Sequence, residues 1–356
     1  VFSAGLASFA IIMVLAGRVL PRVGPRLLTV AGGLLLGGGY VFGGLYGDSF
    51  WVQLLGIGIL GGAGIGLAYV VPISVCVKWF PDKKGMITGL AVAGFGFGAT
   101  IWVKLAGSWF GGLLDTTSVF GLPGVQSVFV IYGFALAALV LIGSVVMINP
   151  PDDYLPDGWT PPVTENNDHE GAVEFRARDM LRTPQFYMLW SVFMFAGISG
   201  LMVIYCIKLF GIDALEYHGV TGAGAITGTA MAWYAIFNGA GRIAWGSVSD
   251  RIGRKTTITL MAALQGVTML ITYHVFISFG LAYGFIVVAA LIGFNYGGSF
   301  ALVPAITADY FGNKNVGSNY GWMFTAYGVA GLAGPLLAGY FKDAAQGSAQ
   351  PDVWMT

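Results

Sequence analysis

The sequence predicts an all-α membrane protein. Only 34 of its 356 residues are charged (17 Lys and Arg plus 17 Asp and Glu), or 10%, whereas a soluble domain carries about 25%. Apolar residues make up 56%, and 56 glycines are scattered through the apolar runs, as is common in bilayer helices. This composition excludes a disordered chain, a secreted disulfide scaffold and an ordinary cytosolic enzyme.

Ten apolar runs are long enough to cross a bilayer, because a membrane helix needs about 20 mainly apolar residues. Nearly all of the charge lies in the connections between them. One connection is long and rich in proline, and it divides the chain into an N-terminal bundle (1–148), a central loop (149–186) and a C-terminal bundle (187–356). The predicted spans are residues 1–20, 27–47, 51–79, 86–110, 127–148, 187–210, 225–247, 256–276, 279–308 and 316–341.

Both ends of the sequence indicate further helices. Apolar sequence runs from residue 1, and the polar stretch PDVWMT at the other end is typical of the lead-in to another span. We therefore expect two bundles of six helices, in which this chain supplies helices 2–11 and the lead-in to helix 12, with the first and last helices outside it.

Lysine and arginine are distributed unequally between the two sides of the predicted bilayer. If the central loop faces the cytoplasm, 13 of the 17 cations lie on that side, Lys104, Lys208 and Lys342 lie on the outer side, and Arg242 remains within a span. Cytoplasmic loops are enriched in Lys and Arg, so we predict a multi-pass protein of the inner cell membrane with a cytoplasmic central loop. Lys104 and Lys208 lie near helix ends, from which a long side chain reaches the interface.

The two halves of the sequence echo each other. GRVLPRVGPR (residues 17–26) returns as GSVSDRIGRK (246–255), and KWFPDKKG (78–85) returns as DYFGNKNVG (309–317). Any helix–loop–helix can have a basic cytoplasmic turn, but two echoes at nearly the same offset favour a true repeat. Repeats related by an axis along the membrane normal place a substrate site at midplane between the halves.

Three stretches carry a resemblance to a known family: residues 78–98, 179–190 and 237–255. With the basic loops, they resemble the oxalate/formate antiporter family of the major facilitator superfamily, which is related to the monocarboxylate transporters. The resemblance implies a secondary carrier with the major facilitator fold, two six-helix bundles related by a pseudo-two-fold axis. Pro21 departs from the superfamily pattern, which has an Asp there, whereas Asp250 keeps it.

Arg242 is the cation that lies deepest in a predicted span. It is about 10 Å from the cytoplasmic end of its helix at 1.5 Å per residue, where burial of an arginine costs at least ~2.5–3.5 kcal/mol. The 17 acids all lie at helix ends or in loops. We expect a substrate carboxylate to supply the counter-ion through a bidentate contact. The alternative is that Arg242 reaches the interface or pairs with Asp250 or Asp309.

Helical spacing places Asn238, at i−4, on the same face as Arg242. Its amide can donate a hydrogen bond to the same carboxylate. Animal monocarboxylate transporters have an Asp there that is implicated in proton coupling, and asparagine cannot titrate. The resemblance further assigns Tyr69 and Tyr296 to aromatic pocket positions, and it places Tyr327 where oxalate carriers have a second cation, a lysine. The alternative for each tyrosine is simple packing.

The resemblance also implies a gate. Asp250 and the loop cations, which include Arg251 and Arg254, are expected to anchor helix ends and to hold one side of the carrier closed. Lys104 is a rival intramembrane cation, and we expect it near the outer surface instead.

These observations favour proton-coupled symport of a small monocarboxylate such as L-lactate or pyruvate, because one midplane cation suits one carboxylate. The alternatives are oxalate/formate-type anion exchange and a transporter-like sensor or receptor. An enzyme is excluded because no catalytic pair lies within the spans. Both cysteines lie in apolar runs and no nucleotide-binding segment is present. We therefore expect no metal, cofactor or nucleic acid, and the predicted partners are an organic anion, protons and the bilayer.

Overall fold

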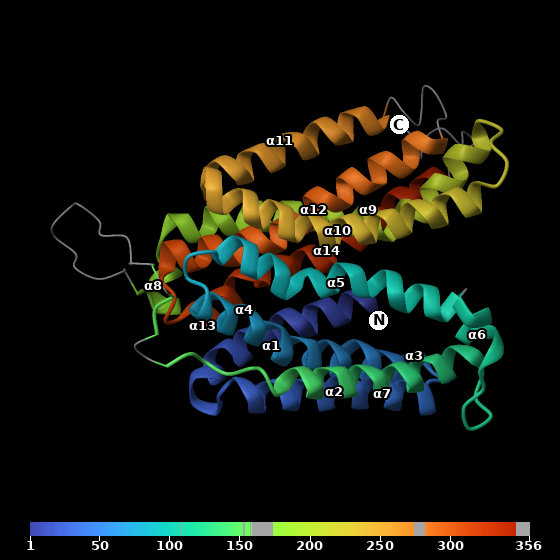
Figure 1. Cartoon of the computed structure of the whole chain (residues 1–356). Helices are drawn as coiled ribbons and strands as arrows, with labels where there is room; N and C mark the ends of the chain where they lie inside the picture. The colour runs from blue at the N-terminus through green and yellow to red at the C-terminus, as the bar shows by residue number, and fades with distance from the viewer. Residues whose placement is uncertain (108, 152–153, 157, 159–173, 274–281, 347–356) are drawn as a thin grey trace.

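The computed structural model describes residues 1–107, 109–151, 154–156, 158, 174–273 and 282–346. Within these residues the chain forms helices and no strand, and the helices lie side by side in two layers (Figure 1). Eight helical segments of this part of the chain are long and apolar enough to cross a membrane. The predicted fold class, an all-α membrane protein, is confirmed.

The first half of the chain closely follows the predicted spans. Predicted span 51–79 is one continuous helical segment, because a π-helical stretch, η1 (Leu54–Gly61), joins two α-helices. A short 3-10 turn, η2 (Trp109–Gly111), follows the predicted span 86–110. The helices are α1 (Phe2–Val23), α2 (Pro25–Leu45), α3 (Phe50–Gln53), α4 (Gly62–Trp79), α5 (Lys84–Gly107), α6 (Leu113–Thr116) and α7 (Gly124–Ser144).

The second half differs in detail. Predicted span 316–341 is interrupted at Phe324, and much of the central loop and the connection at 274–281 lie outside the described residues. The helices are α8 (Ala177–Met180), α9 (Pro184–Tyr217), α10 (Ala223–Ile252), α11 (Arg254–Tyr273), α12 (Ala282–Phe311), α13 (Val316–Met323) and α14 (Thr325–Gln346).

Two long helices, α10 and α11, are not among the eight apolar segments. α10 is interrupted by small and polar residues that are nevertheless buried, among them Thr227, Asn238, Arg242 and Ser249. Neighbouring helices shield it, since α10 packs against α12 on one side and α5 on the other. The polar side chains of α10 therefore face neighbouring helices, as is usual for polar groups in membrane helices.

The two halves of the chain meet along two helix pairs, α5 with α10 and α1 with α13. In addition, α12 packs on α5 and α14 packs on α1. In Figure 1, α5 lies between the layer of α10 and α12 and the layer of α1 and α2.

Glycines allow the closest approach at both pairs. A Cβ atom on Gly17 would lie 2.3 Å from the carbonyl oxygen of Gly317, and one on Gly246 would lie 2.2 Å from that of Gly85. Gly17 and Gly246 are equivalent in the sequence echo, as are Gly85 and Gly317. The two contacts are therefore the same contact made twice, once by each repeat. Small residues at such crossings let membrane helices pack backbone to backbone.

The helix–helix turns of the echo also share one conformation. Gly24 ends α1 with φ 85° and ψ 159°, and Gly253 ends α10 with φ 87° and ψ 156°. These positive φ values favour glycine. The repeat in the sequence is therefore a repeat of backbone geometry.

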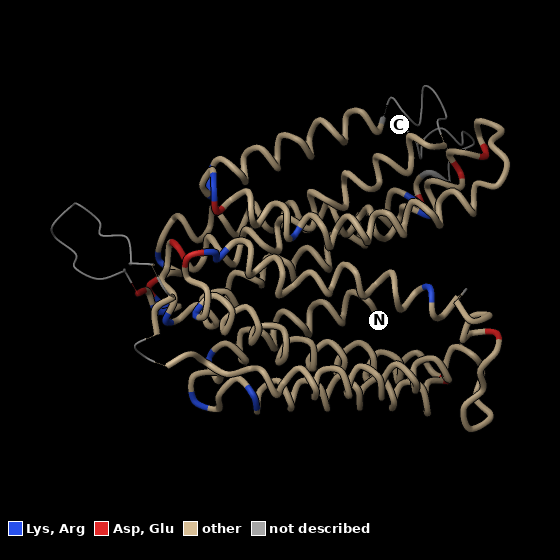
Figure 2. Tube along the Cα trace, in the orientation of Figure 1, with Lys and Arg blue, Asp and Glu red and all other residues tan. Residues whose placement is uncertain are grey.

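Most of the charged positions along the described chain lie at one end of the molecule (Figure 2). We call this the gate end and define it by residues 80–84, 249–254 and 309–315. The opposite end is the mouth end, defined by residues 104–107, 208 and 225.

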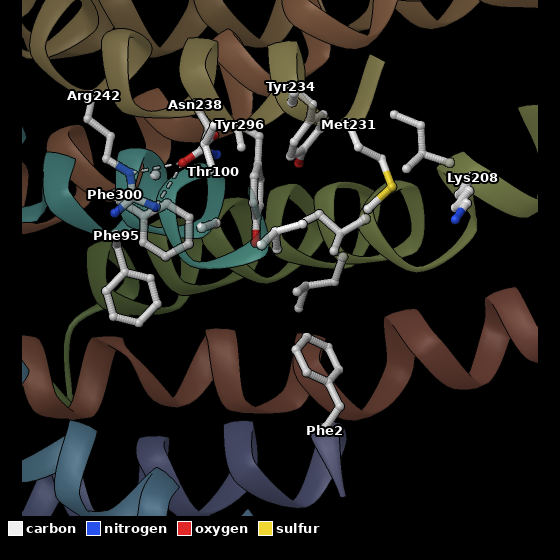
Figure 3. Close-up of a pocket in the computed structure, with 18 of the residues that line it drawn as sticks. Phe2, Phe95, Thr100, Lys208, Met231, Tyr234, Asn238, Arg242, Tyr296 and Phe300 are labelled. Atoms are coloured by element: carbon white, nitrogen blue, oxygen red, sulfur yellow. Dashed lines mark hydrogen bonds between the residues drawn. The ribbon is translucent and has the colours of Figure 1, made fainter. Parts of the chain in front are cut away.

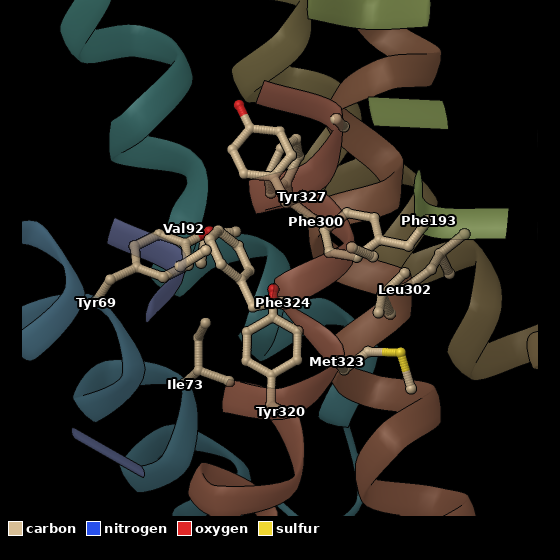
Figure 4. Close-up of a cluster of buried hydrophobic side chains, with 14 of the residues drawn as sticks. Tyr69, Ile73, Val92, Phe193, Phe300, Leu302, Tyr320, Met323, Phe324 and Tyr327 are labelled. Carbon is tan, nitrogen blue, oxygen red and sulfur yellow. The ribbon is translucent and has the colours of Figure 1, made fainter. Parts of the chain in front are cut away.

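An aromatic cluster lies where the two halves meet (Figure 4). Phe324, at the break between α13 and α14, is fully buried. Its ring centroid lies 4.6 Å from Phe9, 5.6 Å from Tyr69 and 5.1 Å from Tyr327. Aromatic pairs at these separations add stability beyond their buried area.

Candidate functional site

Arg242 lies on α10 and is 3% exposed. Its Nε and Nη2 atoms donate to Oδ1 of Asn238 at 3.1 and 3.0 Å, and Nη1 donates to the carbonyl oxygen of Val92 on α5 at 2.9 Å. The guanidinium therefore has hydrogen-bond partners on both sides of the α5–α10 interface.

No ion pair between described residues includes Arg242. Asp250 and Asp309, the two acids considered as its partners, instead bind Arg254 and Lys84 at the gate end. The alternative in which Arg242 pairs with either acid is therefore wrong.

Aromatic rings replace a carboxylate around the guanidinium. The Cζ atom of Arg242 lies 4.4 Å from the centroid of Phe300 and 5.9 Å from that of Phe95. Cation–π attraction of this kind is worth about 2 kcal/mol when the pair is desolvated. It offsets part of the cost of burial and leaves the net positive charge in place.

A cavity of about 860 Å³ opens beside Arg242 between the two halves (Figure 3). All five side chains predicted to bind substrate line this one cavity: Arg242, Asn238, Tyr69, Tyr296 and Tyr327. The structure brings them together, although they come from α4, α10, α12 and α14.

The tyrosines of the cavity contact one another and neighbouring aromatic rings. Tyr296 donates from its hydroxyl to that of Tyr327 at 3.1 Å, and Tyr69 packs edge-on against Phe95 with ring centroids 5.4 Å apart. Tyr234, two helical turns before Arg242, also lines the cavity and approaches the carbonyl oxygen of Gly200 at 3.5 Å. Tyr234 is eight residues before Arg242, a spacing that puts both side chains on one face of α10.

At the gate end the two halves are joined by polar contacts between α10 and α5. Asp250 accepts hydrogen bonds from the backbone amides of Gly85 and Met86 at 2.9 and 2.8 Å. It therefore caps the N-terminus of α5, where a negative charge is favourable. Arg254 Nη1 lies 2.6 Å from the same carboxylate and donates to Ser249 Oγ at 2.5 Å.

A second acid extends this network. Asp309, at the end of α12, lies 2.7 Å from Arg254 Nε and 2.8 Å from Lys84 Nζ. Lys84 belongs to α5 in the other half of the chain. We call Lys84, Asp250, Arg254 and Asp309 the gate network.

Two of the three residues predicted for the gate, Asp250 and Arg254, lie in this network. Arg251 lies beside them but is exposed, and it makes no hydrogen bond or ion pair with the described residues. Lys84 and Asp309 belong to this network but were not among the residues predicted for the gate. The sequence feature that could have indicated them is the second echo, because its two copies contain Lys84 and Asp309 and both copies are predicted at the cytoplasmic end of the molecule.

The two repeats are not equivalent at the gate. The position that matches Asp250 in the first repeat is Pro21, inside the last turns of α1. Proline has no carboxylate, and among the described residues no side chain caps the first turn of α13, whereas Glu174 accepts hydrogen bonds from the amides of Asn313 and Lys314 just ahead of it. Instead Arg18 places its Cζ 5.2 Å from the centroid of Trp322 across the α1–α13 contact.

Two packed halves, a cavity between them and a closed network at one end define a multi-pass membrane transporter rather than an enzyme. The family model described as Major Facilitator Superfamily matches residues 1–231 and 216–346. The chain therefore belongs to the Major Facilitator Superfamily, and the resemblance found in the sequence is confirmed.

Curated relatives match most of the chain. The uncharacterized MFS-type transporter YhjX of Escherichia coli (strain K12) is 29% identical over 335 residues, which cover 93% of this chain and 76% of that protein. The oxalate:formate antiporter of Oxalobacter formigenes is 29% identical over 320 residues (89% and 69%). The apicoplast pyruvate carrier 1 of Toxoplasma gondii is 25% identical over 368 residues (91% and 66%).

Solved structures share the fold. The transporter FucP in its outward conformation aligns with a TM-score of 0.66 at 15% identity, over 99% of this chain and 84% of that one. The proton:xylose symporter XylE aligns with a TM-score of 0.63 at 14% identity (99% and 81%).

Proposed function

We propose that this transporter carries small monocarboxylates such as L-lactate or pyruvate, in symport with protons, by alternating access of the central cavity. One observation carries the proposal: Arg242 is buried at the inner end of a cavity whose described lining includes no Asp or Glu. A carboxylate that reaches this guanidinium supplies the missing negative charge through charge-assisted hydrogen bonds.

The cavity lining supports a substrate with one carboxylate and a small apolar body. Arg242 is the single cation at the end of the cavity that is lined by aromatic rings. Tyr327 stands at the position where the resemblance to oxalate carriers implies a second cation, a lysine. Phe300, Phe95 and Phe324 supply apolar walls beside it. Small-molecule sites commonly combine apolar walls with a few polar groups that orient the ligand.

We further propose that the protein lies in the inner cell membrane with its gate end and central loop in the cytoplasm. The excess of Lys and Arg at that end supports this orientation. The structure then corresponds to a cavity that faces outward. The division into an N-terminal bundle (1–148), a loop (149–186) and a C-terminal bundle (187–356) belongs to the same proposal, with Asp250 and Arg254 as gate residues.

Anion exchange is the second candidate. It is favoured by the 29% identity to an oxalate:formate antiporter. In an exchanger the empty cavity would not return across the membrane, and each carboxylate would leave in exchange for another.

Uptake of labelled L-lactate into liposomes that contain the full-length protein tests the proposal. We expect accumulation driven by an inward proton gradient, and we expect Arg242→Lys to lose at least about tenfold in uptake. Lysine keeps the charge but lacks the planar fork that binds a carboxylate through two hydrogen bonds.

Arg251→Lys is the matched control, because Arg251 is on the same helix and is exposed. It should retain uptake. If L-lactate and pyruvate are not taken up while oxalate exchanges for formate, the symport proposal is wrong and the exchange candidate replaces it.

A further inference from the structure

The mouth end of the cavity is lined by two lysines that come from opposite halves of the chain. Lys104 lies in the last turn of α5 and Lys208 lies on α9. Figure 3 shows Lys208 and Arg242 at opposite ends of the drawn lining. Three cations and no Asp or Glu are therefore found among the described residues that line the cavity.

A free hydroxyl lies between the two ends. Thr100, one turn before Lys104, lines the cavity, and its buried Oγ1 has no hydrogen-bond partner among the described residues. Buried threonines elsewhere in the helices, such as Thr88 and Thr227, donate to the carbonyl oxygen four residues earlier. A buried hydroxyl without a partner is costly, and a ligand in the cavity can satisfy it.

α5 connects these groups to Arg242. Gly96, one turn before Thr100, is so close to α10 that a Cβ atom there would lie 3.0 Å from Oδ1 of Asn238. Asn238 in turn accepts hydrogen bonds from Arg242. One face of α5 therefore carries Lys104, Thr100 and Gly96 over two helical turns. It leads from the mouth end of the cavity to the end that holds Arg242.

We propose that Lys104, Lys208 and Thr100 form a second anion site, the outer anion site, which binds the substrate carboxylate before it reaches Arg242. The inference rests on the proposed function for the class of ligand. Charges in an apolar cavity focus the electric field and raise the local concentration of a counter-ion by about 10-fold to 10³-fold. A lysine is a flexible point charge and suits passing contact, whereas the arginine fork suits the final site.

The competing explanation is that both lysines only extend to the membrane interface. Lys342 provides the comparison, because it is near the end of α14 at the same side and does not line the cavity. If charge at the mouth end acts without regard to the cavity, removal of Lys342 should have the same effect as removal of Lys104 and Lys208.

Charged thiol reagents test the site without any substrate. Ala235 lines the cavity on α10, so Ala235→Cys, in a protein with Cys76→Ser and Cys206→Ser, is the probe. The rates of modification by an anionic and a cationic methanethiosulfonate are measured and divided. We expect Lys104→Gln with Lys208→Gln to lower this ratio about tenfold at low salt and much less at about 1 M salt, where the Debye length is about 3 Å.

Lys342→Gln should leave the ratio unchanged, because Lys342 does not line the cavity. The double variant with Lys104→Arg and Lys208→Arg should also keep the wild-type ratio, because it retains both positive charges. An unchanged ratio in the double Gln variant, or an equal fall in Lys342→Gln, would overturn the outer anion site.

Transport kinetics give the second test. The double Gln variant should raise the KM for L-lactate severalfold with little change in the maximal rate. Thr100→Val should also raise the KM, but the salt dependence of the KM should stay as in the wild type. Unchanged KM values would contradict the proposal. If the wild-type protein moves no carboxylate while the labelling ratio still falls in the double Gln variant, the outer anion site stands and the proposed substrate is wrong.

Discussion

The amide oxygen of Asn238 accepts hydrogen bonds from both Nε and Nη2 of Arg242, one helical turn further along α10. These two N–H groups form one edge of the guanidinium, the kind of edge that binds a carboxylate through two parallel hydrogen bonds. Asn238 therefore occupies the position of a carboxylate on this edge of the guanidinium. Because the amide is neutral, it satisfies the donors without neutralising the charge.

This relationship predicts the effect of Asn238→Asp. A carboxylate at position 238 would form an ion pair with Arg242 one turn away and compete with the substrate, so uptake at pH 7 should fall at least about tenfold, which corresponds to about 1.4 kcal/mol. Protonation of the new carboxyl would remove the competitor. Uptake by the variant should therefore recover as the pH is lowered. Wild-type uptake at pH 7 in this variant would contradict the prediction.

The gate network predicts that Asp250→Ala opens the gate end. The variant loses two hydrogen bonds to the N-terminus of α5 and the ion pair with Arg254. Charge-assisted bonds of this kind are worth roughly 1.5–3 kcal/mol each. A cysteine at Ser74, which is 2% exposed and faces Gly317 across the halves, reports the opening.

We expect the rate of alkylation of Ser74→Cys to rise about tenfold or more in Asp250→Ala. Asp82→Ala is the control, since Asp82 pairs with its own neighbour, Lys83, rather than across the halves. An equal increase in both variants would indicate general loosening and not loss of the gate.

The glycine crossings predict a position-specific loss of transport along α5. A methyl group at Gly85 would lie 2.4 Å from the carbonyl oxygen of Gly246, and one at Gly89 would lie 2.2 Å from that of Arg242. Gly85→Ala and Gly89→Ala should each prevent close packing and reduce uptake severalfold. Gly94→Ala is the matched control on the same helix, because nothing lies within 4 Å of its added Cβ. Comparable uptake in all three variants would contradict this reading of the crossings.

The difference between the repeats predicts that Pro21→Asp strengthens the gate. Position 21 is related to α13 as Asp250 is related to α5, because the Gly17–Gly317 contact repeats the Gly246–Gly85 contact. A carboxylate there can accept from the first amides of α13 and stabilise the closed gate by about 0.5–2 kcal/mol. We expect slower alkylation of Ser74→Cys and a lower maximal rate of uptake. Faster alkylation would show that the added charge opens the gate.

Much of the architecture could be predicted from local sequence. Apolar runs of sufficient length gave the spans, and the spacing of residues 238 and 242 on one helix placed them on one face. The echo of Gly17–Arg26 in Gly246–Lys255 predicted a repeat that the backbone confirms at Gly24 and Gly253. Ends of elements were less accurate, since α9 begins at Pro184 and the last predicted span breaks at Phe324.

Contacts between distant residues could not be predicted in the same way. Lys84 and Asp309 are 225 positions apart, and nothing local to either residue identifies the other. The same holds for the bond from Arg242 to the carbonyl oxygen of Val92, because a backbone acceptor has no signal in the residue type.

The sequence by itself determined that the chain is a bundle of membrane helices with one deeply buried arginine and no acid near it in depth. These properties depend on amino-acid composition and on the spacing of residues along a single helix. Only the tertiary structure decided that Asn238 and Val92 satisfy this arginine, that Asp250 and Asp309 join the two halves at the gate end, and that Lys104 and Lys208 share its cavity. Those relationships depend on how helices cross, and glycine contacts between distant segments set the crossings.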